Sequence, residues 1–279
     1  MAVESFREAI RQIRAQPLLW VPGIVAGLFA AGLWLMLSYS GAFFTSRLVI
    51  FAGLILMVFI TGMLVTIRDK EGSLTTLVRG GITYYFRVLL PQLVILFMLV
   101  VIFILIFVTS GFLGAAMDPG VVGMLTFCVM IPTLMLTYFF DVAAVFEDKR
   151  VFESIQRSSV LVSENLVDVI TFYILCAVSS CVILFALMFT WEITLFERLA
   201  PLADYSQEQI QAFTYTEFLT ILGPDGMWIT AFFLFIGGVL LVPLLYSYKA
   251  CFFQKLAKGA LDIQQVGGEY DSKGRWYKY

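Results

Sequence analysis

Long uninterrupted runs of apolar residues dominate the chain, and short polar segments separate them. Six charge-free runs each reach the length of about 20 residues that a helix needs to cross the hydrocarbon core of a bilayer. Turn signals precede several of these runs, as in Asp118-Pro119-Gly120. The pattern therefore predicts six membrane-spanning helices. Their expected bounds are 18–38, 48–67, 88–108, 121–145, 169–190 and 227–248.

The first apolar run also resembles a secretory signal peptide in its position near the N-terminus. It is too long for the apolar region of such a peptide, and the acidic residues Glu4 and Glu8 precede it. We therefore interpret it as a span.

The overall composition indicates that the fold is surrounded by lipid rather than by water. Of the 279 residues, 61% are hydrophobic and only 14% are charged, whereas soluble domains are about a quarter charged. So little charge cannot cover a water-facing surface. We expect an all-α, polytopic membrane protein with one membrane domain over residues 1–260 and a tail over residues 261–279.

The distribution of Lys and Arg predicts the orientation of the spans. All 18 basic residues but Arg47 and Arg198 fall on the side that holds both chain ends. Cytoplasmic loops carry this excess of positive charge, so we expect both termini in the cytoplasm and the spans in the plasma membrane. The opposite loop, 191–226, is acidic but contains apolar positions. One interpretation is a small structured cap that attracts cations or basic partners. The alternative, which we favour, is a solvated loop that happens to be acidic.

An amphipathic segment precedes each odd-numbered span. The three segments share one pattern, seen in Phe6-x-x-Ala9-x-Arg11, Leu74-x-x-Leu77-x-Arg79 and Phe152-x-x-Ile155-x-Arg157. Such helices lie in the membrane interface with basic residues toward the headgroups, so Arg11, Arg79 and Arg157 are candidates for headgroup contact. The pattern fits three repeated units of interfacial helix plus helical hairpin, over 5–67, 73–145 and 151–248. It also fits unrelated helices that share a membrane surface.

Catalytic and metal-binding patterns do not emerge from the sequence. The chain has no histidine, which removes the commonest metal ligand and general base. None of its four cysteines are paired at zinc-ligand spacing. The net charge is −2 without a basic patch that would bind nucleic acid. We expect no cofactor, no metal, no nucleic-acid partner and no enzymatic activity.

Asp141 is the one carboxylate well inside an apolar segment, which makes it a candidate functional residue. Pro132 lies nine residues earlier and is expected to loosen or kink the fourth span. An acid in a kinked helix suits an ion- or solute-coupled path. Alternatively, Asp141 lies near the cytoplasmic interface and pairs with Lys249 or Arg157, so that its role is structural.

A short motif follows the fourth span and leads into the fifth. It consists of Val145-Phe146-Glu147-Asp148-Lys149, then Phe152-Glu153-Ser154-Ile155-Gln156-Arg157-Ser158, then Glu164-Asn165-Leu166. The motif resembles a signature of the membrane domain found with glycerophosphodiester phosphodiesterases and in related stand-alone membrane proteins. Ser154 takes the place of the usual small residue of its "A-x-x-x-S" helix, and Ser159 that of an aromatic residue. The phosphodiesterase is a separate soluble barrel, so the resemblance does not imply its activity.

These patterns favour a non-enzymatic, membrane-embedded domain for assembly, anchoring or lipid interaction. The expected partners are membrane lipids, together with a membrane-protein partner or a second copy of the chain. A transporter or permease-like protein that moves a lipid or small solute is the alternative. Dependence of a proton-coupled flux on Asp141 distinguishes the two.

Overall fold

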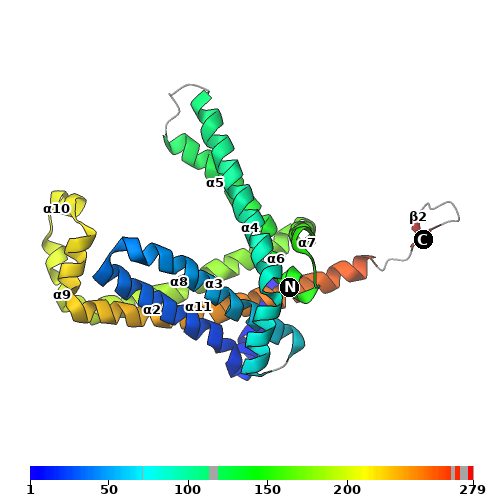
Figure 1. The fold of residues 1–279 in the computed structure, drawn as a ribbon, viewed down its shortest axis with the longest axis horizontal. Coiled ribbons are helices and arrows are strands. Elements are labelled where there is room, and N and C mark those ends of the chain that lie inside the picture. Colours follow the sequence, from blue (N-terminus) through cyan, green and yellow to red (C-terminus); the bar gives the residue numbers. More distant parts are fainter. Residues whose placement is uncertain (71, 113–118, 265–267, 271–275, 279) are drawn as a thin grey trace. The chain divides into compact units, whose positions relative to one another are not determined.

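The computed structural model describes residues 1–70, 72–112, 119–264, 268–270 and 276–278, and nearly all of these are helical (Figure 1). The elements, in chain order, are α1 (Ala2–Ala15), the 3-10 helix η1 (Pro17–Trp20), α2 (Val21–Ser40), α3 (Ala42–Asp69), α4 (Leu74–Phe112), α5 (Pro119–Thr137), α6 (Phe140–Phe146), α7 (Val151–Glu164), α8 (Leu166–Thr194), α9 (Phe196–Leu199), η2 (Ala200–Asp204), α10 (Gln207–Ala212), α11 (Tyr215–Gln264), β1 (Gly268–Tyr270) and β2 (Trp276–Lys278).

Six helical segments of the described chain are long and apolar enough to cross a membrane. They are Pro17–Ser40, Thr45–Asp69, Leu74–Thr109, Val122–Phe146, Leu166–Thr194 and Tyr215–Lys258. Each predicted span falls on one of them, so the all-α fold with six spans is confirmed. Several segments exceed the predicted length because the helices continue into the flanking polar regions.

The second amphipathic segment, 74–85, does not form the separate interfacial helix that its sequence suggests. It is the beginning of α4, which runs without a break to Phe112. The apolar face of its first turns packs on α3: a Cβ at Gly62 would lie 2.1 Å from the Leu77 carbonyl oxygen, and one at Gly81 would lie 2.1 Å from the Val58 carbonyl oxygen. The middle segment of the expected repeat, 73–145, therefore differs from the first and third segments, in which α1 and α7 are separate helices.

The chain divides into two compact units, which we describe one at a time. The first unit contains residues 1–9, 82–172 and 248–279, and the second contains residues 10–81 and 173–247. The single membrane domain over residues 1–260 stays a prediction.

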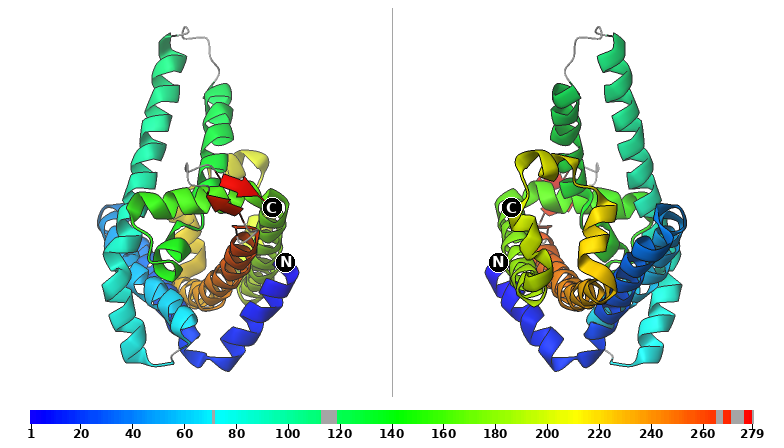
Figure 2. Two further views of the ribbon diagram at one scale, coloured as in Figure 1. Left: turned by 90° about the vertical axis from the view of Figure 1, so that its right-hand side faces the viewer. Right: turned by 90° about the vertical axis from the view of Figure 1, so that its left-hand side faces the viewer.

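In the second unit, α2 and α3 form an antiparallel hairpin and lie side by side (Figures 1 and 2). Gly41 joins them with a φ of 77°, a conformation that favours glycine. α2 also packs closely on the membrane-crossing part of α11. A Cβ at Gly27 would lie 2.4 Å from the Phe235 carbonyl oxygen, and one at Gly238 would lie 2.5 Å from the Gly27 nitrogen. The small residues bring the two backbones into contact, as in other membrane helix pairs.

The acidic loop 191–226 is structured, as the cap interpretation expects, and contains α9, η2 and α10 before α11 begins. Its single basic residue, Arg198, holds the loop to α11. The guanidinium donates to the Leu222 carbonyl oxygen at 2.6 Å and to the Asp225 carboxylate at 2.7 Å. Leu222 precedes Gly223, where a φ of 62° interrupts the helix. Arg198 therefore satisfies a carbonyl group at this interruption.

In the first unit, the last part of α11 extends past the predicted end of the sixth span and becomes part of a protein core. Six of the eight residues from Lys249 to Leu256 are at most 5% exposed. The start of α1 joins this core, since the Phe6 ring contacts the Tyr248 ring edge-on at 5.1 Å between centroids.

Part of the predicted tail, residues 261–279, lies outside the described residues. Its described part continues α11 to Gln264 and then pairs β1 with β2 in an antiparallel ladder, Glu269 opposite Tyr277.

The glycine contacts of α2 predict opposite effects of two identical substitutions. Gly27→Ala places a methyl group against the backbone of α11 and should destabilise the protein by about 1–3 kcal/mol. Gly32→Ala in the same helix meets no atom within 4 Å and should stabilise it by up to about 1 kcal/mol through helix propensity. Thermal unfolding in detergent measures both. Equal shifts for the two variants would contradict the close packing.

Candidate functional site

The fourth span is broken between α5 and α6, in the first unit, at Tyr138 and Phe139. The break leaves backbone groups without helical partners, and one side chain from α7 satisfies two of them. The Ser158 hydroxyl donates to the Leu136 carbonyl oxygen at 2.7 Å and accepts from the Phe139 N–H at 2.9 Å. Ser158 is completely buried, so the groups it bonds are shielded from water. This hydroxyl stabilises the break where no water can.

A buried ion pair lies just beyond the break. Asp141, in the first turn of α6, accepts from Lys249 of α11, whose Nζ lies 2.7 and 2.8 Å from the two carboxylate oxygens. Both residues are only 5% exposed. The ammonium also lies 4.0 Å from the centroid of the Tyr138 ring, a cation–π distance. One Asp141 oxygen additionally accepts from the Val142 N–H at 2.8 Å. The two charges therefore satisfy each other inside the protein.

Aromatic rings of the first unit, which also contains this pair, pack against one another. We call Phe139, Phe172, Tyr248, Phe252 and Phe253 the aromatic core. Each ring is at most 1% exposed, and the centroids of Phe172 and Phe252 stack at 4.7 Å. Such ring pairs add about 0.5–1.5 kcal/mol each beyond their buried area. Because the rings come from the break, the start of α8 and the end of α11, the core fixes these three elements around the ion pair.

The turn after α6 is closed by a second ion pair. Arg157 of α7 forms a two-pronged contact with Glu147, with Nε to Oε2 at 2.9 Å and Nη2 to Oε1 at 3.0 Å. Both side chains are about four-fifths buried. The carboxylate of Glu153 accepts from the Arg150 backbone N–H at 3.1 Å and completes the start of α7. This turn fixes the orientation of α7, which carries Ser158.

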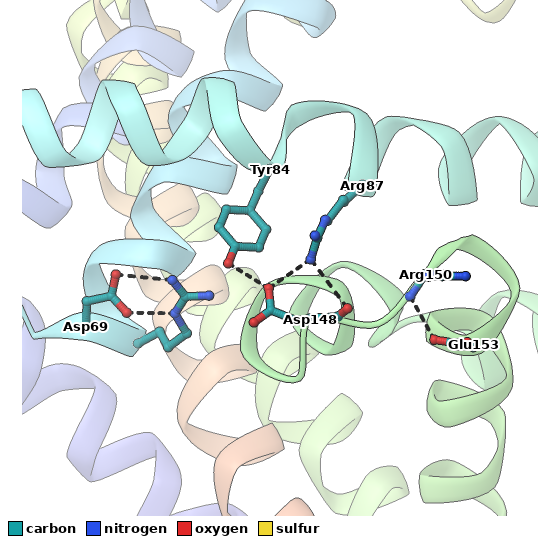
Figure 3. Close-up of polar contacts among 7 residues, drawn as sticks. Asp69, Tyr84, Arg87, Asp148, Arg150 and Glu153 are labelled. Carbon is teal, nitrogen blue, oxygen red and sulfur yellow. Dashed lines mark hydrogen bonds and ion pairs between the residues drawn. The ribbon is translucent and has the colours of Figure 1, made fainter.

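Figure 3 shows how the same turn is tied to α4. Asp148 has a φ of 52°, and its carboxylate accepts from the Tyr84 hydroxyl at 2.6 Å and from the Arg87 guanidinium at 2.9 Å. The Arg87 and Asp148 side chains are at least half exposed. An ion pair in such contact with solvent contributes about 0–1 kcal/mol, so this contact orients the turn more than it stabilises the fold.

The structure separates the residues that the sequence grouped as candidates. Asp141 meets Lys249, one of the two partners expected for a structural role, while Arg157 pairs with Glu147. Arg11 and Arg79 are exposed, on α1 and on the first turns of α4. Whether any of these residues contacts a ligand or a headgroup stays a prediction.

Two features of the site escaped the sequence reasoning. The break does not fall at Pro132, because α5 remains helical through it to Thr137; a proline disturbs the turn before it rather than the turn after it. The bridging role of Ser158 was also missed. The serine of the "A-x-x-x-S" pattern was the only signal for it, and nothing in the sequence shows which backbone groups a serine bonds.

The arrangement offers ion pairing and backbone satisfaction rather than a ligand cage. Within the described residues, no group of three or more His, Cys, Asp or Glu side chains could hold a metal ion.

Comparison with known proteins adds one match. The model of a domain family of unknown function, DUF7847, matches residues 1–256. It gives no link to the membrane domain of the phosphodiesterases, so that resemblance stays an interpretation of the sequence. No curated protein and no solved structure matches the chain significantly.

The bridge across the break predicts a large effect of removing one hydroxyl. Ser158→Ala leaves the Phe139 N–H and the Leu136 carbonyl without that partner and should cost about 1–3 kcal/mol. Ser163→Ala, in the same helix, removes an exposed hydroxyl that only returns to the Ser159 carbonyl oxygen and should change stability by less than about 0.5 kcal/mol. Thermal unfolding in detergent compares them. A harmless Ser158→Ala would show that the break needs no bridge.

The ion pair predicts a similar contrast between two aspartates. Asp141→Asn leaves the Lys249 ammonium buried without its counter-charge and should destabilise the protein by about 3–5 kcal/mol. Asp148→Asn removes an exposed ion pair and should cost less than about 1 kcal/mol. Both substitutions change the net charge equally, so chemical unfolding in one detergent isolates the effect of burial. Similar losses for both would contradict it.

Proposed function

The chain belongs to the DUF7847 family, a domain family of unknown function, and on that premise we propose that it is a non-enzymatic, membrane-embedded domain for assembly, anchoring or lipid interaction. The six apolar helices support a multi-pass membrane protein.

The burial of Asp141 supports the proposed non-enzymatic role. The carboxylate that the sequence singles out as a functional candidate, Asp141, is paired with Lys249, and both residues are buried. Intramembrane charges of a solute pathway commonly line a water-filled cavity, although they also pair with one another. The two charges here face each other and are about 95% buried. The pair therefore favours a role in holding α6 to α11. A domain whose polar groups are used in this way is suited to presenting a stable surface.

The proposal includes an orientation and partners. The bias of Lys and Arg supports both termini on the cytoplasmic side of the plasma membrane. In this orientation the Asp141–Lys249 pair lies at the cytoplasmic ends of the fourth and sixth spans. Membrane lipids are the proposed partners, together with a membrane protein or a second copy of the chain.

A transporter for a lipid or small solute is the second candidate, and one observation favours it. The fourth span is a broken helix with an acid in the first turn after the break. Discontinuous helices with nearby charged groups form the substrate and ion sites of many transporters. In that case Asp141 and Lys249 must separate during the cycle.

Replacing the pair as a whole tests the proposal. The variant Asp141→Leu/Lys249→Met exchanges two buried charges for apolar side chains and should keep most of the stability. Full-length wild type and variant are reconstituted into liposomes, and proton flux and phospholipid scrambling are measured with fluorescent reporters. We expect neither protein to exceed protein-free liposomes. Native mass spectrometry should find the same bound lipids or second copy in both.

A wild-type flux that disappears in the variant, while its thermal unfolding stays cooperative, would replace this proposal with the transporter. Loss of bound lipid or partner in the well-folded variant would also contradict it, because the pair would then act in recognition.

A further inference from the structure

Basic side chains gather at one end of the second unit. Arg11 and Arg14 lie on the last turns of α1, and Lys70 ends α3. Because α2 and α3 are antiparallel, the start of α2 and the end of α3 lie at the same end of this hairpin. The end of α1 and the end of α3 also lie near each other in the views of Figures 1 and 2. We call Arg11, Arg14 and Lys70 the basic end.

These side chains point away from the protein. Arg11, Arg14 and Lys70 are exposed, and none has an ion-pair partner among the residues that the structure describes. Ile13, between the two arginines, is 6% exposed, which fixes the opposite face of this turn against the protein. The neighbouring carboxylate of Asp69 is neutralised by Arg68 at 2.7 Å. Among the described residues, the basic end therefore presents positive charge without an ion-paired counter-charge.

The depth of the basic end follows from the spans beside it. Arg14 lies three residues before Pro17, where one membrane-crossing segment begins, and Lys70 directly follows Asp69, where the next one ends. Along the chain, Lys70 adjoins an apolar run, Arg14 is separated from one by Ala15 and Gln16, and Arg11 lies about 4.5 Å before Arg14 on α1. The headgroup layer on each side of the hydrocarbon core is about 5–7 Å thick. The cations are thus at the level of lipid phosphates.

We propose that Arg11, Arg14 and Lys70 form a binding surface for the headgroups of anionic phospholipids. The inference rests on the proposed function and names the lipid class involved. Guanidinium groups suit phosphate because their planar donors match two of its oxygens, and a cation near an anionic leaflet gains about one kcal/mol, or roughly a fivefold preference. Arg157, at the corresponding position of α7, is not included because Glu147 already binds it.

The test compares two double variants that remove equal charge. Arg11→Gln/Arg14→Gln removes two cations of the basic end. Lys273→Gln/Lys278→Gln removes two cations of the tail, which lie at least 15 residues beyond Lys258, where the last membrane-crossing segment ends. The full chain is reconstituted in phosphatidylcholine vesicles with spin-labelled phosphatidylglycerol or phosphatidylcholine. Electron paramagnetic resonance then gives the preference of the protein for the anionic lipid.

We expect wild type to prefer phosphatidylglycerol, the Arg11/Arg14 variant to lose about tenfold to thirtyfold of that preference, and the Lys273/Lys278 variant to keep most of it. Equal losses in both variants would show that the preference for phosphatidylglycerol depends on net charge alone, and would overturn the proposal. Inorganic phosphate should compete no better than sodium chloride of equal ionic strength; stronger competition would assign the surface to free phosphate instead.

A wild type with no preference for phosphatidylglycerol overturns this inference alone. The proposed function is then still decided by the flux and native mass spectrometry measurements, which do not depend on anionic lipid.

Discussion

The ion pair between Asp141 and Lys249 is the interaction on which the first unit depends. Burying either charge alone would cost several kcal/mol, so neither α6 nor the end of α11 can take its position without the other. The pair joins residues that are 108 positions apart in the chain. It therefore fixes the contact between α6 and α11 at the ends of the fourth and sixth spans. The aromatic core packs between the elements that this contact brings together.

The broken fourth span depends on a further buried contact, the Ser158 bridge. A continuous helix from α5 into α6 would not need Ser158, whereas the observed break at Tyr138 and Phe139 exposes backbone groups that Ser158 bonds inside the protein. The Glu147–Arg157 contact positions α7 so that this hydroxyl reaches the break. Local backbone satisfaction, turn geometry and the buried ion pair thus support one arrangement, which suits a stable embedded domain.

The spans could be predicted from the sequence because a helix that crosses a bilayer needs a long run of consecutive apolar residues. The partner of Asp141 could be narrowed to two basic residues by their charge together with their expected position near the cytoplasmic interface. The docking of 74–81 on α3 could not be foreseen, since a helix that packs on protein and one that lies on lipid need the same apolar face. The break was missed for a related reason: it depends on a hydroxyl 22 residues away from the carbonyl it bonds.

The most direct measurement is the coupling energy between Asp141 and Lys249 from a double-mutant cycle of Asp141→Leu, Lys249→Met and the combined variant, by chemical unfolding in detergent. If the pair organises the first unit, each single substitution should be far more destabilising than the double one, with a coupling energy of about 2 kcal/mol or more. Additive effects, with a coupling energy near zero, would contradict the account.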